Sequence, residues 1–333
     1  MSHLSPAGFL TRAAAVLGAA VAIAPAAAQT RIDMVGFGGA SNLPVWVAQE
    51  RGLFAKEGIE VALERTPSSL ALFKNLMAGK YQIGSAAIDN VIAYVEGQAE
   101  AQIDGFDIVS FLGVHSGLVS LVARPEIKSF RDMAGKTVAV DSPASGYALV
   151  LYRILDEKGL VRNRDYTVLA VGGTGERLAA MRKNEAAVSL ISPPQDLEAQ
   201  RLGFNMMGDA TASLGAYQGS VYNVRRSWAK DHEREMLAFV RGVVAAHDLI
   251  FTDKAGTIAV LQKRIKGLDA ADAGMIYARL TGTGGFNRKA QISLDGLKTV
   301  LSVRSAYGEP RKTLADPYKY IDLGYYEKAM RGK

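Results

Sequence analysis

Residues 43–64 read LPVWVAQERGLFAKEGIEVALE, and this stretch sets the fold class of the whole chain. Val45–Glu57 carries apolar residues at helical spacing, and Gly58 ends the predicted helix. Ile59–Leu63 then alternates as a strand does, and Ile32–Phe37 upstream is strand-like as well. A strand, a helix and a second strand in this order predict a parallel unit in which the helix covers the sheet.

The same alternation continues along most of the chain. Further strands are predicted at Tyr81–Ala86, Phe106–Val114, Leu118–Ala123, Lys136–Val140, Thr167–Val171, Ala187–Ile191 and Ser220–Val224. Helices are predicted at Leu70–Ala78, Asn90–Glu96, Tyr147–Lys158, Glu176–Lys183, Gln195–Leu202, Asp231–Thr252, Lys254–Ile265, Ala270–Leu280 and Leu294–Ser305. We therefore expect an α/β protein with mainly parallel sheets covered by helices.

Residues 1–28 have the order of a secretory signal peptide. Arg12 supplies a positive charge, an apolar run follows from Ala13 to Ala24, and Ala26–Ala28 form a small-residue cleavage site before Gln29. The apolar run is shorter than the ~20 residues that span a bilayer. The sequence has no cysteine, which excludes disulfides and a lipid-anchoring cysteine. These features predict a monomeric periplasmic protein, exported by a cleavable signal and not lipid-anchored.

Neither nucleic acid nor a dinucleotide is indicated as a ligand. The net charge is +6, but the basic residues are scattered among acidic ones, with no run longer than a pair. The glycine-rich segment VGFGGASNLP, residues 35–44, has Ser41 where a dinucleotide fingerprint needs its third glycine. Leu43-Pro44 also interrupts the chain before the helix begins.

Several segments carry a recurring pattern. The first has Pro44, Ala48, Gly52-Leu53-Phe54, Glu57-Gly58-Ile59 and Val61. The second has Leu76, Ala78-Gly79-Lys80 and Ile83-Gly84, with Gln82 in place of the usual aspartate. The third has Ile127-Lys128-Ser129, Asp132-Met133-Ala134-Gly135-Lys136 and Val138-Ala139-Val140, and Tyr320-Ile321-Asp322 and Tyr325-Tyr326 follow near the end. Together they resemble the solute-binding proteins of ABC importers for nitrate, sulfonates, taurine and thiamine-precursor pyrimidines.

The resemblance implies two α/β lobes of the type II-like periplasmic binding protein fold, with a ligand cleft between them. Lobe 1 would comprise residues 29–118 and 221–333, and lobe 2 residues 119–220. The implied function is to capture a small solute by cleft closure and to deliver it to the permease subunits of an ABC importer at the inner membrane. The alternative is an enzyme on the same scaffold, acting on a pyrimidine or a menaquinone-pathway intermediate. Related pyrimidine synthases carry a cysteine-rich motif, which this chain lacks.

Ligand contacts are expected where strands end and helices begin, because free backbone amides lie there. Gly39 lets the backbone approach a ligand, and Ser41 and Asn42 can donate hydrogen bonds to it. His115 ends a strand close to the expected crossing between the lobes. Junctions between strands and helices supply the other candidates, which are Ser68, Ala87, Asp89, Ser145, Gly146, Tyr147, Thr174 and Pro193. Three have structural alternatives, because the glycine-rich segment around Gly39 fits a turn without ligand contact, Ser68 fits a helix N-cap and Tyr147 fits a packing role.

No catalytic, metal or cofactor site is predicted. His232 lies at a helix start between two acidic residues that complement the helix dipole, and His247 fits an apolar helix face. No pair of histidines has metal-ligand spacing, and no Gly-x-Ser-x-Gly appears. The charge of the ligand stays open. Serine-rich helix N-termini favour a sulfonate, carboxylate or nitrate-like anion, whereas Asp89 and Asp141 favour an amine or a pyrimidine-like compound.

Overall fold

The computed structural model describes residues 1–3, 29–210 and 212–331, so the predicted signal peptide lies almost entirely outside the described residues. The chain forms two five-stranded sheets with helices packed on them. The first sheet has the order β2 (Ile59–Arg65), β1 (Thr30–Gly36), β3 (Ile83–Ala87), β10 (Ser220–Arg225) and β4 (Ile108–Gly113). The second has the order β7 (Tyr166–Ala170), β6 (Lys136–Val140), β8 (Val188–Ile191), β5 (Ser120–Ala123) and β9 (Asn205–Asp209).

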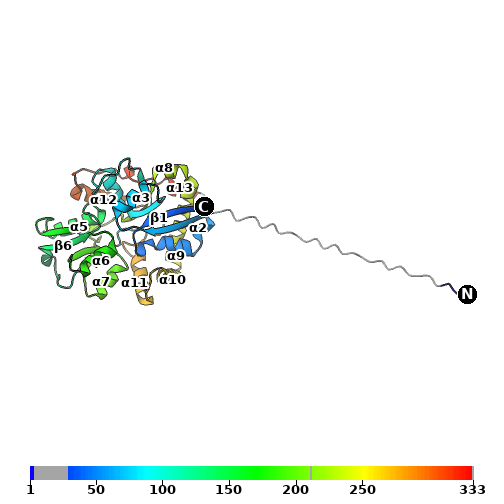
Figure 1. Ribbon diagram of the computed structural model, residues 1–333, viewed down its shortest axis with the longest axis horizontal. Helices are drawn as coiled ribbons and strands as arrows, with labels where there is room; N and C mark the ends of the chain where they lie inside the picture. Colours follow the sequence, from blue (N-terminus) through cyan, green and yellow to red (C-terminus); the bar gives the residue numbers. More distant parts are fainter. Residues whose placement is uncertain (4–28, 211, 332–333) are drawn as a thin grey trace.

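Four strands of each sheet run in one direction and the fifth is reversed. In the first sheet β10 is antiparallel to both β3 and β4, and in the second β5 is antiparallel to both β8 and β9. The expected α/β class, with two lobes and mainly parallel strand direction, is therefore confirmed. Figure 1 shows the lobes side by side, with α5 (Gly146–Asp156), α6 (Thr174–Arg182) and α7 (Gln195–Arg201) around the second sheet.

Residues 43–64 and the strand before them fold as expected, with one difference. Strands β1 and β2 pair in parallel along their whole length, from Thr30 opposite Ile59 to Gly36 opposite Arg65. The predicted single helix is instead two, α1 (Leu43–Glu50) and α2 (Leu53–Lys56). Gly52 between them has φ 63°, a left-handed conformation that ends an α-helix and that glycine adopts without strain.

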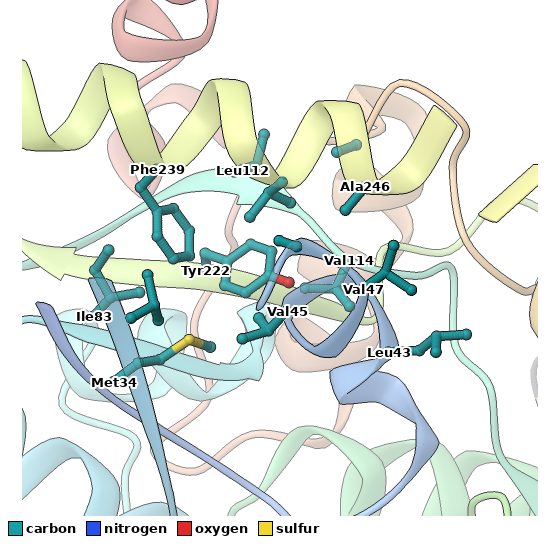
Figure 2. Packing of buried hydrophobic residues seen from close by; sticks show 14 of the residues in the cluster. Met34, Leu43, Val45, Val47, Ile83, Leu112, Val114, Tyr222, Phe239 and Ala246 are labelled. Carbon is teal, nitrogen blue, oxygen red and sulfur yellow. The ribbon is translucent and has the colours of Figure 1, made fainter. Parts of the chain in front are cut away.

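The first lobe is held together by a core between its sheet and α9 (Glu233–Thr252). Figure 2 shows Phe239 of α9 pointing towards Tyr222 of β10, with Ala246 further along the same helix. The rings of Tyr222 and Phe239 meet edge to face, with centroids 5.2 Å apart and an interplanar angle of 79°. Such a pair contributes about 0.5–1.5 kcal/mol beyond the burial of its area. The remaining first-lobe helices are α3 (Ser69–Met77), α4 (Ile88–Val95), α8 (Arg226–Asp231), α10 (Lys254–Arg264), α11 (Ala270–Thr281) and α13 (Gly324–Arg331).

Two chain segments cross between the sheets, and they lie against each other. The first joins β4 to β5, and the second joins β9 to β10. The amide of Gly219 donates to the carbonyl of His115 at 3.0 Å, and the amide of Val114 donates to the carbonyl of Ser220 at 2.9 Å. Because the crossings are bonded to each other, they form one connection between the lobes.

Helix α12 (Leu294–Tyr307) joins the lobes at a second place. It follows the second crossing in sequence but packs against α5 of the second lobe as well as against α4 of the first. Leu297, Val300 and Leu301 of α12 share a buried cluster with Leu149 of α5 and Ile88 of α4. The two lobes therefore have a common apolar core on this side, which the sequence pattern did not indicate.

Burial of His247 on α9 predicts a loss of stability in mild acid. The side chain is fully buried, its Nδ1 lies 2.7 Å from the carbonyl of Asn287, and burial lowers its pKa to about 4. An unfolded histidine has a pKa of about 6.5. Between these values the unfolded chain takes up a proton that the folded protein does not, so stability present above pH 6.5 is lost as the pH falls towards 4.

We expect this histidine alone to reduce the free energy of unfolding by about 1 kcal/mol between pH 6.5 and 5.5. Urea unfolding of the wild type and of His247→Gln at both pH values measures the contribution of His247 to this pH dependence, because the variant has no histidine at this position. His232→Gln, which removes a histidine that is only partly buried, serves as the matched control. Equal pH dependence of the wild type and His247→Gln would show that the prediction is wrong.

Candidate functional site

A cavity lies between the two lobes, beside the crossings. Its volume is about 70 Å³, on a scale where one water needs about 10–15 Å³, so it has room for a small molecule. Residues that follow β1 and β3 form one wall, and residues that follow β6, β7 and β8 form the other. This is the edge of an α/β sheet where ligands bind, because strands end there and helices begin.

The glycine-rich segment after β1 forms part of the first-lobe wall. Phe37, Gly38 and Ser41 line the cavity. Gly39 beside them has φ 132°, and with this conformation the amide of Ala40 donates to the carbonyl of Pro193 across the cleft at 3.1 Å. The segment therefore touches the opposite lobe through its backbone, and the left-handed glycine makes that approach possible.

Arg177 is the principal cation of the cavity and comes from α6 in the second lobe. The residue is 6% exposed, and burial lowers the pKa of its guanidinium. One terminal nitrogen donates to Thr174 Oγ1 at 2.9 Å and the other to the carbonyl of Gly172 at 3.5 Å. Its Nε has no hydrogen-bond partner among the described residues. A guanidinium has five N–H donors, so Arg177 keeps donors for a ligand.

Asp141, which follows β6, is the carboxylic acid of the same cavity. Its Oδ2 accepts from Ser69 Oγ of the other lobe at 2.6 Å, whereas its buried Oδ1 has no partner among the described residues. Burial raises its pKa, and the bond from Ser69 and the charge of Arg177 act in the opposite direction. Asp141 and Arg177 thus affect each other electrostatically without forming an ion pair within 4.0 Å in the described part of the chain.

His115 of the first crossing and several hydroxyl groups supply the neutral polar contacts. Nδ1 of His115 accepts from the amides of Gly117 and Leu118 at 3.1 and 3.3 Å, so the ring proton lies on Nε2. Burial lowers the pKa of His115 to about 4, and the ring is neutral at pH 7. The hydroxyl groups of Thr174 and Ser192 are 2.9 Å apart. Burial raises the pKa of Tyr147, which stays a neutral phenol.

The lobes are closed over the cavity by further contacts at its edge. Arg279 of α11 forms an ion pair with the fully buried Asp196 of α7, and it donates to Ser120 Oγ at 2.9 Å. Arg65, the last residue of β2, pairs with Glu176 of α6 at 2.5 Å. The amide of Gly173 donates to the carbonyl of Pro67 at 3.1 Å. These contacts hold the two lobes together over the cavity.

The structure brings seven of the predicted contact residues to the cavity wall, namely Ser41, Ala87, His115, Ser145, Tyr147, Thr174 and Pro193. Asn42 lies behind the wall, where its Nδ2 donates to the carbonyl of Phe37 at 2.7 Å. Ser68 caps α3 by accepting from the amide of Ala71 at 3.2 Å, which is its structural alternative. Gly39 contacts the opposite lobe instead of lining the cavity.

Asp89 and Gly146 also lie outside the cavity wall. Asp89 is paired with Arg304 inside the protein, so its carboxylate does not contribute to the charge of the cavity. The amide of Gly146 donates to Asn90 Oδ1 at 2.9 Å, which joins the start of α5 to α4. The wall also contains residues outside the predicted contact set, namely Phe37, Gly38, Asn90, Leu118, Val119, Asp141, Gly173, Arg177, Ser192 and Ser220. Asn90 and Ser220 lie at the starts of a predicted helix and a predicted strand, and this position could have identified them as cavity residues. Nothing in the local sequence distinguishes Arg177 from the other arginines.

Two lobes of mixed sheets, two crossings and a cavity at the carboxyl ends of the strands define a protein of the periplasmic binding protein fold. The chain belongs to the NMT1/THI5-like family, whose family model matches residues 40–254. It is 26% identical over 239 residues to 4-amino-5-hydroxymethyl-2-methylpyrimidine phosphate synthase of Uromyces fabae, a match that covers 66% of this chain and 65% of the synthase. The chain thus spans about 65% of the length of this curated relative.

Two solved structures show the same fold. The alkanesulfonate-binding protein SsuA from Xanthomonas axonopodis pv. citri, bound to MOPS, has a TM-score of 0.69 and 17% identity over 84% of this chain and 93% of that protein. The periplasmic nitrate-binding protein NrtA from Synechocystis PCC 6803 has a TM-score of 0.74 and 14% identity over 91% of this chain and 89% of that protein. No helix in the described part of the chain is long and apolar enough to cross a membrane.

Proposed function

We propose that the protein is the periplasmic substrate-binding component of an ABC importer, which captures a small solute by cleft closure and delivers it to the permease subunits at the inner membrane. The observation that carries the proposal is a cavity whose walls come from two lobes that the paired crossings connect. Binding between two such lobes selects the closed form, because the ligand contacts both walls only when the lobes are together. Structural similarity to solute-binding proteins supports the same function.

The proposal includes a division of the chain and a location. Lobe 1 comprises residues 29–118 and 221–333, and lobe 2 comprises residues 119–220. The sheet to which each strand belongs supports this division, except that Ser220, the first residue of β10, falls on the lobe 2 side. Helix α12 bridges this division, since it packs on both lobes. We place the mature protein, starting at Gln29, in the periplasm as a monomer without a lipid anchor. The absence of cysteine from the sequence agrees with this placement.

An enzyme on the same scaffold is the second candidate, and the similarity to a pyrimidine phosphate synthase favours it. The cavity supports binding better. Its buried histidine is neutral, with Nδ1 occupied by backbone amides, and the sequence offers no cysteine nucleophile. Incubation of the purified protein with pyrimidine precursors, followed by mass spectrometry, distinguishes the two candidates. Multiple turnovers to a phosphorylated pyrimidine would establish the enzyme.

A ligand screen combined with solution scattering tests the transport proposal. Thermal shifts are measured for the mature protein with sulfonates, carboxylates, nitrate, pyrimidines, aromatic acids and amino acids, and hits are confirmed by calorimetry. We expect a hit at 100 times its Kd to stabilise the fold by about 2.7 kcal/mol. The same hit should reduce the radius of gyration, because the ligand-free protein also samples an open form. Absence of any hit across all classes would contradict a solute-binding function.

A further inference from the structure

The cavity holds two groups of opposite charge whose hydrogen bonds are incomplete, the buried Arg177 and the half-buried Asp141. Arg177 makes two hydrogen bonds, both to neutral oxygen atoms of its own segment, and its Nε is buried without a partner. The carboxylate of Asp141 interacts with the hydroxyl and the backbone amide of Ser69, with the hydroxyl donating to Oδ2, and its Oδ1 is buried without a partner. Unsatisfied buried polar atoms are costly, and an unpaired buried charge is more so. The missing partners therefore point to a ligand.

Arg177 and Asp141 do not satisfy each other, although both line the same cavity. No ion pair joins them in the described chain, and the charge of each affects the pKa of the other. Other buried carboxylates near the lobe boundary already have their own cations: Asp89 pairs with Arg304, and Asp196 with Arg279. Arg65, whose side chain lies beside Gly38 of the cavity wall, is paired with Glu176. The cavity is thus left with one positive and one negative group.

We propose that this cavity is selective for a small zwitterion, whose carboxylate or sulfonate binds Arg177 and whose ammonium group binds Asp141. This inference rests on the proposed function and names its ligand class. A monoanion of the same size would satisfy Arg177 but would place no donor on Asp141, and it would bring a second negative charge close to that carboxylate. Phe37, Leu118 and Val119 supply apolar contacts for the carbon atoms between the two charged groups.

The first test compares matched probes on the wild-type protein by calorimetry. Taurine, ethanesulfonate and ethylamine form one set, and β-alanine, propionate and propylamine form the other. Within each set the chain length is constant and only the charged groups differ. We expect the zwitterion of one set to bind at least about tenfold more tightly than its monoanion and its cation. The set that binds more tightly shows whether the anionic group is a sulfonate or a carboxylate.

The second test reverses the preference by a substitution. Asp141→Asn keeps the shape of the side chain and removes its charge, so the zwitterion should lose at least about tenfold in affinity and the matched monoanion should gain. Glu185→Gln removes an exposed negative charge from the same lobe, outside the cavity, and should change neither affinity. Unfolding temperatures of both variants establish that they fold. If Asp141→Asn does not fold, the comparison of matched probes on the wild-type protein still decides the question.

The outcomes separate the two proposals. Zwitterion preference in the wild type and its loss in Asp141→Asn support the ligand class. A wild-type protein that binds monoanions, cations or uncharged pyrimidines and no zwitterion overturns this inference, while solute binding stands. A protein that binds no compound of any class overturns the proposed function and this inference with it.

Discussion

Replacing Arg304 with methionine is expected to reduce the free energy of unfolding by about 3–5 kcal/mol. Arg304 lies on α12 and is fully buried. Its Nε and one terminal nitrogen donate to the two carboxylate oxygens of Asp89 at 2.7 and 2.5 Å, and the same terminal nitrogen donates to the carbonyl of Ala144 at 2.7 Å. Methionine fills much of the space but leaves Asp89 as a buried, unpaired charge.

A control on the same helix and a double substitution isolate the cause. Lys298→Met removes a cation whose partner, Asp295, is exposed, and such a pair contributes about 0–1 kcal/mol. The double variant Asp89→Ala with Arg304→Met leaves no unpaired charge, so it should be more stable than Arg304→Met alone. Chemical unfolding of the three proteins measures these differences. If Arg304→Met is no less stable than Lys298→Met, the ion pair between Asp89 and Arg304 does not stabilise the fold.

Asp89 also shows where the sequence is an insufficient guide to the site. From the sequence, an aspartate after a buried strand is equivalent to Asp141, since both begin the segment that leads into a helix. The structure distinguishes them, because the partner of Asp89 is 215 residues away on α12. Local spacing predicts on which element a carboxylate lies. Tertiary packing decides which cation pairs with it.

Most of the predicted helices and strands are present in the structure. Strands such as Lys136–Val140 were found with the predicted bounds, because a buried strand and its flanking turn are local signals. Strand β9 and helix α13 were not predicted, since the former is largely exposed and the latter is mostly polar. Arg177 was missed for a different reason. Its helix places it one turn inside α6, and only the approach of the other lobe makes that position part of a cavity.

The substitution Gly39→Val is expected to weaken ligand binding by at least about tenfold. We attribute this loss to contact between the lobes and not to a change within either lobe. A Cβ at this position would lie 3.1 Å from the carbonyl oxygen of Pro193 on the opposite lobe. That oxygen accepts the hydrogen bond from Ala40 that joins the closed lobes. Two further methyl groups would push the walls apart, so that a ligand could no longer contact Arg177 and the first lobe at the same time.

Gly52→Val separates this effect from backbone strain. Both glycines have positive φ, 132° at Gly39 and 63° at Gly52, so both substitutions introduce a strain of about 1–3 kcal/mol. A Cβ at Gly52, however, meets no atom within 4 Å, and this glycine lies between α1 and α2, away from the cleft. We therefore expect both variants to unfold at lower temperature, but only Gly39→Val to bind the screened ligand weakly and to keep a large radius of gyration in its presence. Equal affinities of the two variants would mean that the glycine-rich segment does not control closure. In that case the contact between Ala40 and Pro193 would be a consequence of binding and not a requirement for it.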